Sequence, residues 1–358
     1  MKKKILYIVP NLCTLSGVSQ TILNFYPMLL KSFDIDFYVL KKFKDTIDDK
    51  LVDSNIFMSN NFQNGNNYFK EKSDFDLFIK NQHYDIVELH APIFSFIYMP
   101  VLKKNKIPVR IIHTHSSASS NNLLKRIMSF GLNFNMMKYA NVYFSCSETS
   151  ARYWFKKNVF SNPFYYTIYN CVDKTDKDLN KIKEFKNQYG IKENELLYGF
   201  IGRMSKEKNL KFLIDIIETI NIDNCKFLFV GDGNNAKEIR EYAFKHGNKV
   251  IFTGRRNDVP KIISAFDLIF MPSIKEGLPM VAIEAQVNGI NCFLSDNITK
   301  EVDIGAAKFL KLDKDLWINE IYNFKKEKQN IDLKKFSTID CSKRLIDIYN
   351  ELLKRLEW

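Results

Sequence analysis

The segment Phe200-Ile-Gly-Arg-Met-Ser-Lys-Glu-Lys-Asn-Leu210 carries the clearest structural information in this sequence. Its pattern predicts a buried strand that ends at Gly202, a polar loop with Arg203 and Lys208, and then a helix. Arg203 offers a planar fork of donors and Lys208 a point charge, a pair that suits a diphosphate. The helix dipole and its free amides add to the same positive field. Taken alone, however, two loop cations are more simply explained as solvated side chains.

Short apolar runs alternate with amphipathic segments on both sides of this loop, which is typical of βα units and a parallel sheet. The strands predicted in the first half are Lys4–Val9, Asp36–Leu40, Asp85–Leu89, Val109–Thr114 and Val142–Cys146. Those predicted in the second half are Leu196–Ile201, Lys226–Val230, Val250–Phe252, Leu268–Met271 and Asn291–Ser295. The predicted helices include Val18–Lys31, Lys208–Ile220, Ala236–His246, Asp258–Ala265 and Met280–Asn288. We therefore expect an α/β protein with two doubly wound sheets and ligand sites at the carboxyl ends of their strands.

The chain has 358 residues, more than one hydrophobic core usually organises, so two domains are expected. We place the first at residues 1–170 and the second at residues 171–340, which opens with a charged connector and a helix. Residues 341–358 belong to an amphipathic helix, Asp340–Trp358, that we expect to pack back across the two domains.

Composition excludes several classes of protein. With 46% hydrophobic, 26% charged and 14% aromatic residues, the chain is globular rather than disordered. Its longest apolar runs, such as Ile93–Leu102, are about ten residues, short of the roughly 20 that span a bilayer. The run Ile5–Val9 is too short for a signal peptide, so we expect a cytoplasmic protein. Six scattered cysteines without a Cys-x-x-Cys pair predict reduced thiols.

The formal charge of +12 is unevenly distributed. Residues 1–170 hold 21 Lys and Arg against 12 Asp and Glu, and residues 171–358 hold 32 against 29. A basic first half fits an anionic membrane surface or an acidic ligand. A compositional bias of the genome explains it equally well, and no nucleic-acid-binding motif is present.

A second cluster reads Phe270-Met-Pro-Ser-Ile-Lys-Glu-Gly-Leu-Pro-Met-Val-Ala-Ile-Glu-Ala285. Glu276 falls in a loop after a predicted strand, and Glu284 falls on the helix that follows. Gly277 allows a close backbone approach, and the amides from Leu278 onward open the helix. A carboxylate on an apolar helix face is costly to bury without partners. These features predict a loop that grips a hydroxyl-rich, anionic molecule.

Together these motifs resemble glycosyltransferase family 4. The resemblance rests on Gly-Arg-(x)4-Lys at 202–208, Val-Gly-Asp-Gly at 230–233, the element at 254–259, and the Glu-(x)7-Glu spacing of Glu276 and Glu284. It is specific from about Leu196 to Glu301 and weaker, though topologically consistent, over residues 1–170. It implies the GT-B fold, with two Rossmann-like domains facing across a donor cleft, an acceptor-side first domain and a nucleotide-sugar-binding second domain. It also implies a retaining transferase that uses a nucleotide-sugar donor.

The resemblance assigns roles to residues of the second half. Arg203 and Lys208 match the cations that hold the donor diphosphate, and Glu276 matches the glutamate at the transferred sugar. Glu284 matches the carboxylate on the ribose hydroxyls, and Arg255 lies where the family contacts the base. The implied donor-binding set is Gly17, Arg203, Lys208, Gly231, Arg255, Glu276, Gly277, Leu278 and Glu284. The implied catalytic set is Glu276, His115, Arg203 and Lys208.

In the first half, Ser16-Gly17-Val18 resembles the family's glycine loop. His115 resembles the histidine near the reacting sugar, and His113 is the alternate because the strand register is uncertain. A structural strand-end histidine is the competing explanation. His113 and His115 could also form a metal pair, but no third ligand is evident, so no metal site is predicted. One departure is Asn170-Cys-Val-Asp173, where the family often has Asn-Gly-Val-Asp.

The resemblance thus implies a metal-independent hexosyltransferase without a cofactor. The donor would be a UDP-sugar, and the acceptor a glycan or polyprenyl-diphosphate-linked sugar of a cell-surface polysaccharide, such as a capsule or exopolysaccharide. Peripheral attachment to the inner face of the membrane is a further hypothesis.

Three alternatives compete with this interpretation, and the sequence argues against the second and excludes the third. The first is a catalytically silent sugar-nucleotide-binding partner of another transferase. The second, a nucleotide-sugar epimerase, lacks the Glu-(x)7-Glu frame. The third, a nicotinamide dehydrogenase, would need Gly-x-Gly-x-x-Gly after the first strand, where this chain has Pro10-Asn-Leu-Cys-Thr-Leu-Ser-Gly-Val18.

Overall fold

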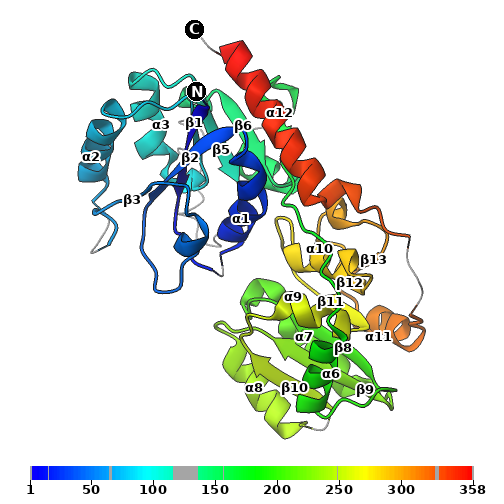
Figure 1. Cartoon of the computed structure of the whole chain (residues 1–358). Coiled ribbons are helices and arrows are strands. Elements are labelled where there is room, and N and C mark those ends of the chain that lie inside the picture. Colours follow the sequence, from blue (N-terminus) through cyan, green and yellow to red (C-terminus); the bar gives the residue numbers. More distant parts are fainter. Residues whose placement is uncertain are drawn as a thin grey trace. The chain divides into compact units, whose positions relative to one another are not determined.

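The computed structural model describes residues 2–14, 16–63, 67–115, 136–155, 157–247, 249–326 and 330–356. The chain forms two compact units (Figure 1), the first from Met1–Cys171 with Ser337–Trp358 and the second from Val172–Phe336. Each unit is built on one sheet whose paired strands all run parallel. This is the α/β architecture that the alternating sequence pattern predicts.

The sheet of the first unit has the strand order β3-β2-β1-β4-β5-β6-β7. Its strands are β1 (Lys3–Val9), β2 (Phe33–Val39), β3 (Ile56–Met58), β4 (Ile86–Leu89), β5 (Val109–Thr114), β6 (Val142–Ser145) and β7 (Tyr165–Thr167). The helices are α1 (Gly17–Leu29), α2 (Tyr68–Lys80), α3 (Ser95–Lys104), α5 (Glu148–Trp154) and α12 (Thr338–Leu356). The order reverses beside β1, because the chain moves outward through β2 and β3 and returns to β4 on the other side.

Both faces of this sheet are covered, so its central strands are continuous apolar runs. In β1, Ile5, Tyr7 and Val9 face the cluster made with α1 and α12, whereas Leu6 and Ile8 face the cluster made with α2 and α3. The alternation follows the two-residue period of a strand. Polar side chains therefore concentrate where strands end.

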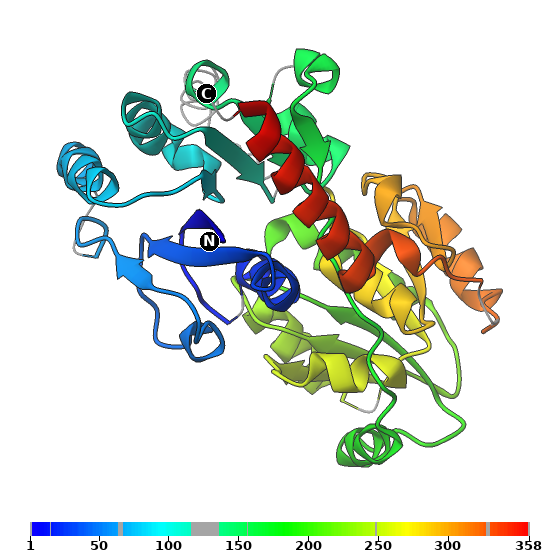
Figure 2. The same ribbon diagram turned by 45° about the horizontal axis from the view of Figure 1, so that its top comes forward.

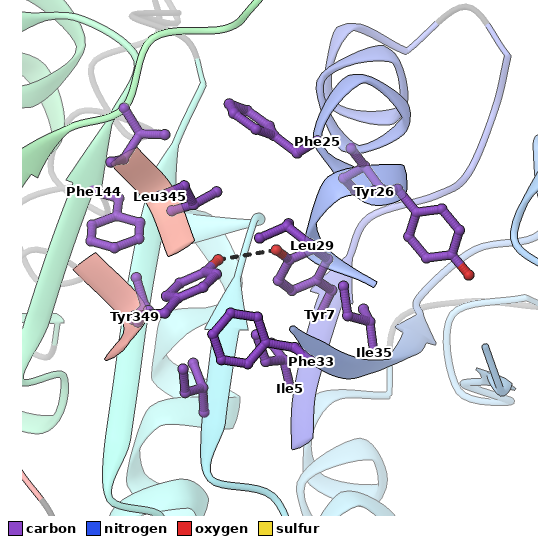
Figure 3. Close-up of a cluster of buried hydrophobic side chains, with 14 of the residues drawn as sticks. Ile5, Tyr7, Phe25, Tyr26, Leu29, Phe33, Ile35, Phe144, Leu345 and Tyr349 are labelled. Atoms are coloured by element: carbon purple, nitrogen blue, oxygen red, sulfur yellow. Dashed lines mark hydrogen bonds between the residues drawn. The ribbon is translucent and has the colours of Figure 1, made fainter. Parts of the chain in front are cut away.

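The C-terminal helix α12 belongs to the first unit. It lies next to α1 in both ribbon views (Figure 1, Figure 2). Its apolar residues recur at helical spacing and are buried in the cluster with β1 and α1; they are Leu345, Ile348, Tyr349, Leu352 and Leu353. Figure 3 shows Leu345 and Tyr349 among the residues of this cluster. The helix thus completes one face of the first sheet.

The sheet of the second unit has the order β10-β9-β8-β11-β12-β13. Its strands are β8 (Leu196–Ile201), β9 (Cys225–Val230), β10 (Val250–Gly254), β11 (Leu268–Met271), β12 (Asn291–Ser295) and β13 (Ala307–Leu310). The helices are α6 (Leu179–Gln188), α7 (Leu210–Thr219), α8 (Ala236–Lys245), α9 (Val259–Ile262), α10 (Met280–Val287) and α11 (Lys314–Tyr322). Residues of α7, α8 and α11 pack on one face of the sheet, and α10 packs against β11 and β12.

The predicted elements differ from the structure mainly at their ends. Strand β2 begins at Phe33 rather than Asp36, and α7 begins at Leu210 after a 3-10 turn over Lys206–Lys208. The predictions omitted the edge strands β3, β7 and β13, which have only three or four residues each. An edge strand is stabilised by pairing with one neighbour, so its own residues carry a weak signal.

We expect Leu352→Ala to destabilise the first unit by about 2–5 kcal/mol, because Leu352 is fully buried between α12 and the sheet. The matched control is Ile339→Ala in the same helix, where the side chain is 55% exposed. Urea unfolding of the full chain, read by hydrogen exchange in β1, measures both. Equal effects of the two substitutions would show that α12 does not support this core.

Candidate active site

The second unit brings the two sequence clusters together at the carboxyl edge of its sheet. Strand β8 lies between β9 and β11, at the point where the strand order reverses. The loop after β8 carries Arg203 and Lys208, and the loop after β11 carries Ser273 and Glu276. In doubly wound sheets, ligands bind in the crevice at this reversal point.

Direct contacts join these two loops. The Lys208 ammonium donates to Oε1 of Glu276, and the Ser273 hydroxyl donates to the same oxygen at 2.7 Å. The Ile274 N–H donates to the Glu207 carbonyl at 2.8 Å. The side chains of Lys208 and Glu276 are only 14% and 12% exposed. The pair is therefore largely desolvated and more strongly coupled than a surface ion pair.

The two arginines singled out in the sequence are more open. Arg203 is exposed, with one guanidinium nitrogen 3.5 Å from Glu207, and Arg255 is exposed at the end of β10. The structure does not bring Arg255 to the Lys208–Glu276 pair through any contact that it describes. Both guanidiniums are available to an approaching anion.

Arg256, which sequence reasoning missed, anchors the loop that carries Arg255. Its guanidinium makes two bonds to Asp258, at 2.8 and 2.7 Å, and one to the Tyr189 hydroxyl at 3.1 Å. These contacts raise the pKa of Arg256 and lower the pKa of Asp258. The available signal was the Arg-x-Asp spacing, because two residues this close in sequence can form a bidentate pair.

Glycines allow the strand ends to approach each other closely. Gly231 has φ 142°, and a Cβ there would lie 1.9 Å from the Gly202 carbonyl oxygen. The Gly231 N–H donates to the Gly254 carbonyl at 2.9 Å. The loops after β8, β9 and β10 thus form one backbone surface that a side chain at Gly231 would push apart.

Helix α10 continues from the Glu276 loop. Leu278 is buried, Gly277 and Pro279 flank it, and the helix begins at Met280. Glu284 lies inside this short helix, and burial raises the pKa of its carboxyl group. A carboxylate kept in such surroundings suggests a partner from outside the chain.

The first unit places Gly17 and the histidines at its own sheet edge. Gly17 begins α1 after β1, and a Cβ there would meet no described atom within 4 Å. His113 lies in β5 and His115 directly follows it. His90 follows β4, which pairs with β5 through Leu89 and Ile112.

His90 therefore joins the pair noted in the sequence. The ring centroids of His113 and His115 are 4.1 Å apart, and those of His90 and His115 are 5.1 Å apart. The available signal for His90 was that a histidine lies at the carboxyl end of both β4 and β5. This signal becomes informative only when these two strands are known to be adjacent. Sequence reasoning had found only the pair of His113 and His115, without a third ligand.

Burial lowers the pKa of each histidine in this group. The pKa of His113 falls to about 3, and those of His90 and His115 lie well below their usual range. The three imidazoles are therefore neutral at physiological pH. Asn170 lies beside His115 and partly opposes the lowering of its pKa.

One nitrogen of each ring lies within 4.8 Å of the others, close enough for a metal ion to be considered. The observed contacts favour a hydrogen-bonded group instead. His90 Nδ1 and His115 Nε2 are 2.8 Å apart, and His113 Nδ1 is 2.7 Å from Oε1 of Glu88. The planes of the His90 and His115 rings lie within 18° of parallel.

Comparison with known proteins gives a consistent result. Residues 181–306 match the sequence model of a family described as glycosyl transferases group 1. The chain is 24% identical over 322 residues to the "Putative glycosyltransferase EpsF" of Bacillus subtilis, covering 87% of this chain and 84% of that protein. It is 25% identical over 230 residues to an Escherichia coli "UDP-Gal:alpha-D-GlcNAc-diphosphoundecaprenol alpha-1,3-galactosyltransferase", covering 61% of this chain and 59% of that protein.

Among solved structures, Anabaena HepE in complex with UDP superimposes with a TM-score of 0.75 at 15% identity, covering 98% of this chain and all of HepE. The chain therefore has the GT-B fold. Its residues 181–306 are similar in sequence to the group 1 glycosyltransferases. Within the described residues, no helix combines the length and the apolar character needed to cross a bilayer.

We expect Glu284→Gln to stabilise the ligand-free protein at high pH. Because burial raises the folded pKa of Glu284, the wild type loses stability as pH rises from the ordinary glutamate range, about 4.3. The uncharged amide avoids that loss, so the melting temperature of the variant should exceed wild type at pH 8 and converge with it near pH 4. Each kcal/mol corresponds to about 2–4 °C for a domain of this size.

Differential scanning fluorimetry across this pH range measures the effect. Glu238→Gln, at an exposed site on α8, is the matched control. A Glu284→Gln variant that follows this control at every pH would contradict the argument.

Proposed function

We propose that the protein is a retaining hexosyltransferase that moves a sugar from a UDP-sugar to a lipid-linked or oligosaccharide acceptor in cell-surface polysaccharide synthesis. The observation that carries this proposal is the desolvated Lys208–Glu276 pair at the strand-order reversal, with Ser273 on the same carboxylate oxygen. A cation binds a diphosphate and a carboxylate accepts hydrogen bonds from sugar hydroxyls, so this pair suits a ligand in which a diphosphate is joined to a sugar ring.

The donor would lie along the carboxyl edge of the second sheet. Lys208 and the exposed Arg203 would bind the diphosphate, and the amides of Gly277 and Leu278 would add donors at the start of α10. Glu276 would accept hydrogen bonds from the transferred sugar, and Glu284 from the ribose diol. Gly231 would give the nucleotide close access to the backbone, with Arg255 beside the base.

The reaction we propose is front-face transfer with retention. The acceptor hydroxyl attacks the anomeric carbon while the bond to the donor phosphate breaks, and the departing phosphate oxygen takes the acceptor proton. Lys208, Arg203 and the α10 amides would stabilise the charge that develops on the diphosphate, so no metal is required. His115, with His113 as the alternate, would contact the reacting sugar, and Gly17 would place backbone amides near phosphates or acceptor.

The relatives support the substrate class. The Escherichia coli relative is named for a UDP-galactose donor and a diphosphoundecaprenol-linked acceptor, and HepE was solved with UDP and with UDP-glucose. A further relative lies in a "cps region" of Klebsiella pneumoniae.

We expect UDP or one UDP-sugar to raise the melting temperature of the wild type, with the same shift in EDTA. Lys208→Ala should abolish most of the shift and lower turnover by about 10²–10³-fold, the usual cost of removing one group that stabilises transition-state charge. Lys211→Ala, a lysine 77% exposed on α7, is the matched control and should behave as wild type.

Retained turnover in Lys208→Ala would remove the site assignment. A shift that EDTA abolishes would contradict metal independence. Nucleotide binding without turnover on any lipid-linked acceptor would favour the silent partner subunit.

We propose that the first unit also attaches to an anionic membrane surface. The segment from residue 337 onward adds four basic and four acidic side chains, so the basic excess of residues 1–170 stays with this unit. On α2, Phe69 is 92% exposed and is followed by the exposed Lys70 and Lys72, and the last turn of the adjacent α3 carries the exposed Lys103. An aromatic side chain among cations suits a headgroup layer.

We expect the protein to cosediment with vesicles that contain anionic lipid at low salt, and less so at high salt. Phe69→Ser should weaken this binding, whereas Phe244→Ser, 92% exposed on α8 of the second unit, should not. If the protein does not bind these vesicles even at low salt, the membrane proposal is wrong, whereas the transferase proposal is unaffected.

A further inference from the structure

Glu88 is a carboxylate buried in the hydrophobic core of the first unit. It lies in β4 with 1% of its surface exposed, on the same face of the sheet as Ile86 and the apolar cluster covered by α1 and α12. Burying a carboxylate is expensive unless hydrogen bonds compensate it, and burial raises its pKa. A buried side chain of this cost needs a specific explanation.

A chain of tyrosine hydroxyls supports one side of the carboxylate. Tyr349 of α12 donates its only hydroxyl proton to Oε2 of Glu88. The hydroxyl of Tyr7 in β1 lies 3.0 Å from that of Tyr349 (Figure 3). Because the Tyr349 proton is already directed at Glu88, Tyr7 must be the donor to Tyr349. The order is therefore Tyr7 to Tyr349 to Glu88.

The other carboxylate oxygen faces the histidines. His113 Nδ1 lies 2.7 Å from Oε1 of Glu88, and His90 Nε2 lies 3.3 Å from the same oxygen. A carboxylate that accepts this bond requires the proton of His113 to be on Nδ1. Its Nε2, which has no hydrogen-bond partner among the described residues, is then left with a lone pair. His115 packs against this ring.

We propose that α12 is a functional part of the histidine site, because Tyr349 holds Glu88 and Glu88 sets the tautomer and orientation of His113, against which His115 and His90 are placed. Glu88 and Tyr349 are positioning residues in this scheme. The consequence for turnover rests on the proposed function, in which His115 contacts the reacting sugar. Tyr349 thereby acts on a cluster of histidines that lie more than 230 positions earlier in the sequence.

A second buried glutamate in the same unit provides a contrast. Glu71 of α2 accepts hydrogen bonds from the hydroxyls of Tyr38 and Tyr98 at 3.0 and 2.8 Å, and from Ser59 and Asn61. These donors are uncharged hydroxyls and an amide, and no histidine is among them. Glu71 therefore serves the packing of α2 and α3 on the sheet, and its tyrosine donors are suitable controls.

The test compares Tyr349→Phe and Glu88→Gln with Tyr98→Phe in the full chain. Tyr349→Phe and Tyr98→Phe each remove one hydroxyl that donates to a buried glutamate, and Phe can keep the aromatic contacts of Tyr349 with Phe33 and Phe144. Long-range ¹H–¹⁵N correlation spectra of the imidazoles report the tautomers without any substrate. In wild type, His113 should show the Nδ1–H form. Tyr349→Phe and Glu88→Gln should shift the signals of this group, and Tyr98→Phe should not.

Turnover is the second measurement. We expect Tyr349→Phe and Glu88→Gln to lower kcat by about 10–100-fold, the range found where a functional histidine loses the carboxylate that fixes its tautomer and orientation. The affinity for UDP should stay within about twofold, because we assign the nucleotide to the second unit. Tyr98→Phe should keep the wild-type kcat. Its loss of thermal stability should be similar to that of Tyr349→Phe.

The outcomes separate this inference from the proposed function. If the imidazole spectra are unchanged in both Tyr349→Phe and Glu88→Gln, the inference about α12 is wrong. It is also wrong if these variants alter the tautomers but their kcat equals that of Tyr98→Phe. If the wild type transfers no sugar at all, the proposed function fails. The spectra then still decide whether α12 controls the tautomer of His113.

Discussion

A parallel sheet that is covered on both faces favours apolar side chains along its strands, and this constraint governs both units. The inner positions of β1 and β8 are buried, so most of the cations, carboxylates and imidazoles of interest lie in the loops after the strands or, like Glu88 and His113, next to a strand's last residue. Parallel strands end at a common edge, and loops far apart in the sequence therefore become neighbours. Lys208 and Glu276 meet in this way, and so do His90 and His113.

Several glutamates of the protein are buried or partly buried, and the groups that surround them differ. Glu71 is surrounded by hydroxyl and amide donors and serves packing. Glu276 is neutralised by Lys208 and steadied by Ser273. For Glu284, burial alone accounts for the raised pKa. Glu88 is bound on one side by Tyr349 and faces histidines on the other. These differences in partner separate the structural carboxylate Glu71 from Glu276 and Glu284, which are proposed to contact substrate, and from Glu88, which is proposed to position His113.

Much of the second unit could be predicted from the sequence. The bounds of β8, β11 and β12 agree with the predicted strands, because each is an uninterrupted apolar run between polar loops. Prediction was weaker for β3, β7 and β13, which are short and depend on a single neighbouring strand. It also failed to single out Arg256, whose value lies in the geometry of its bonds to Asp258 and Tyr189 rather than in its position beside Arg255.

The sequence by itself determined the alternation of strands and helices, the parallel α/β class and the spacing of Arg203, Lys208, Glu276 and Glu284, because periodicity and motif spacing are local properties of the chain. Only the tertiary structure decided that Lys208 and Glu276 form a partly buried pair, that His90 joins His113 and His115, and that α12 brings Tyr349 to Glu88. Those contacts depend on which strands lie side by side and which helix covers them. No local pattern records such pairings, since the energy that selects them comes from burial summed over the whole unit.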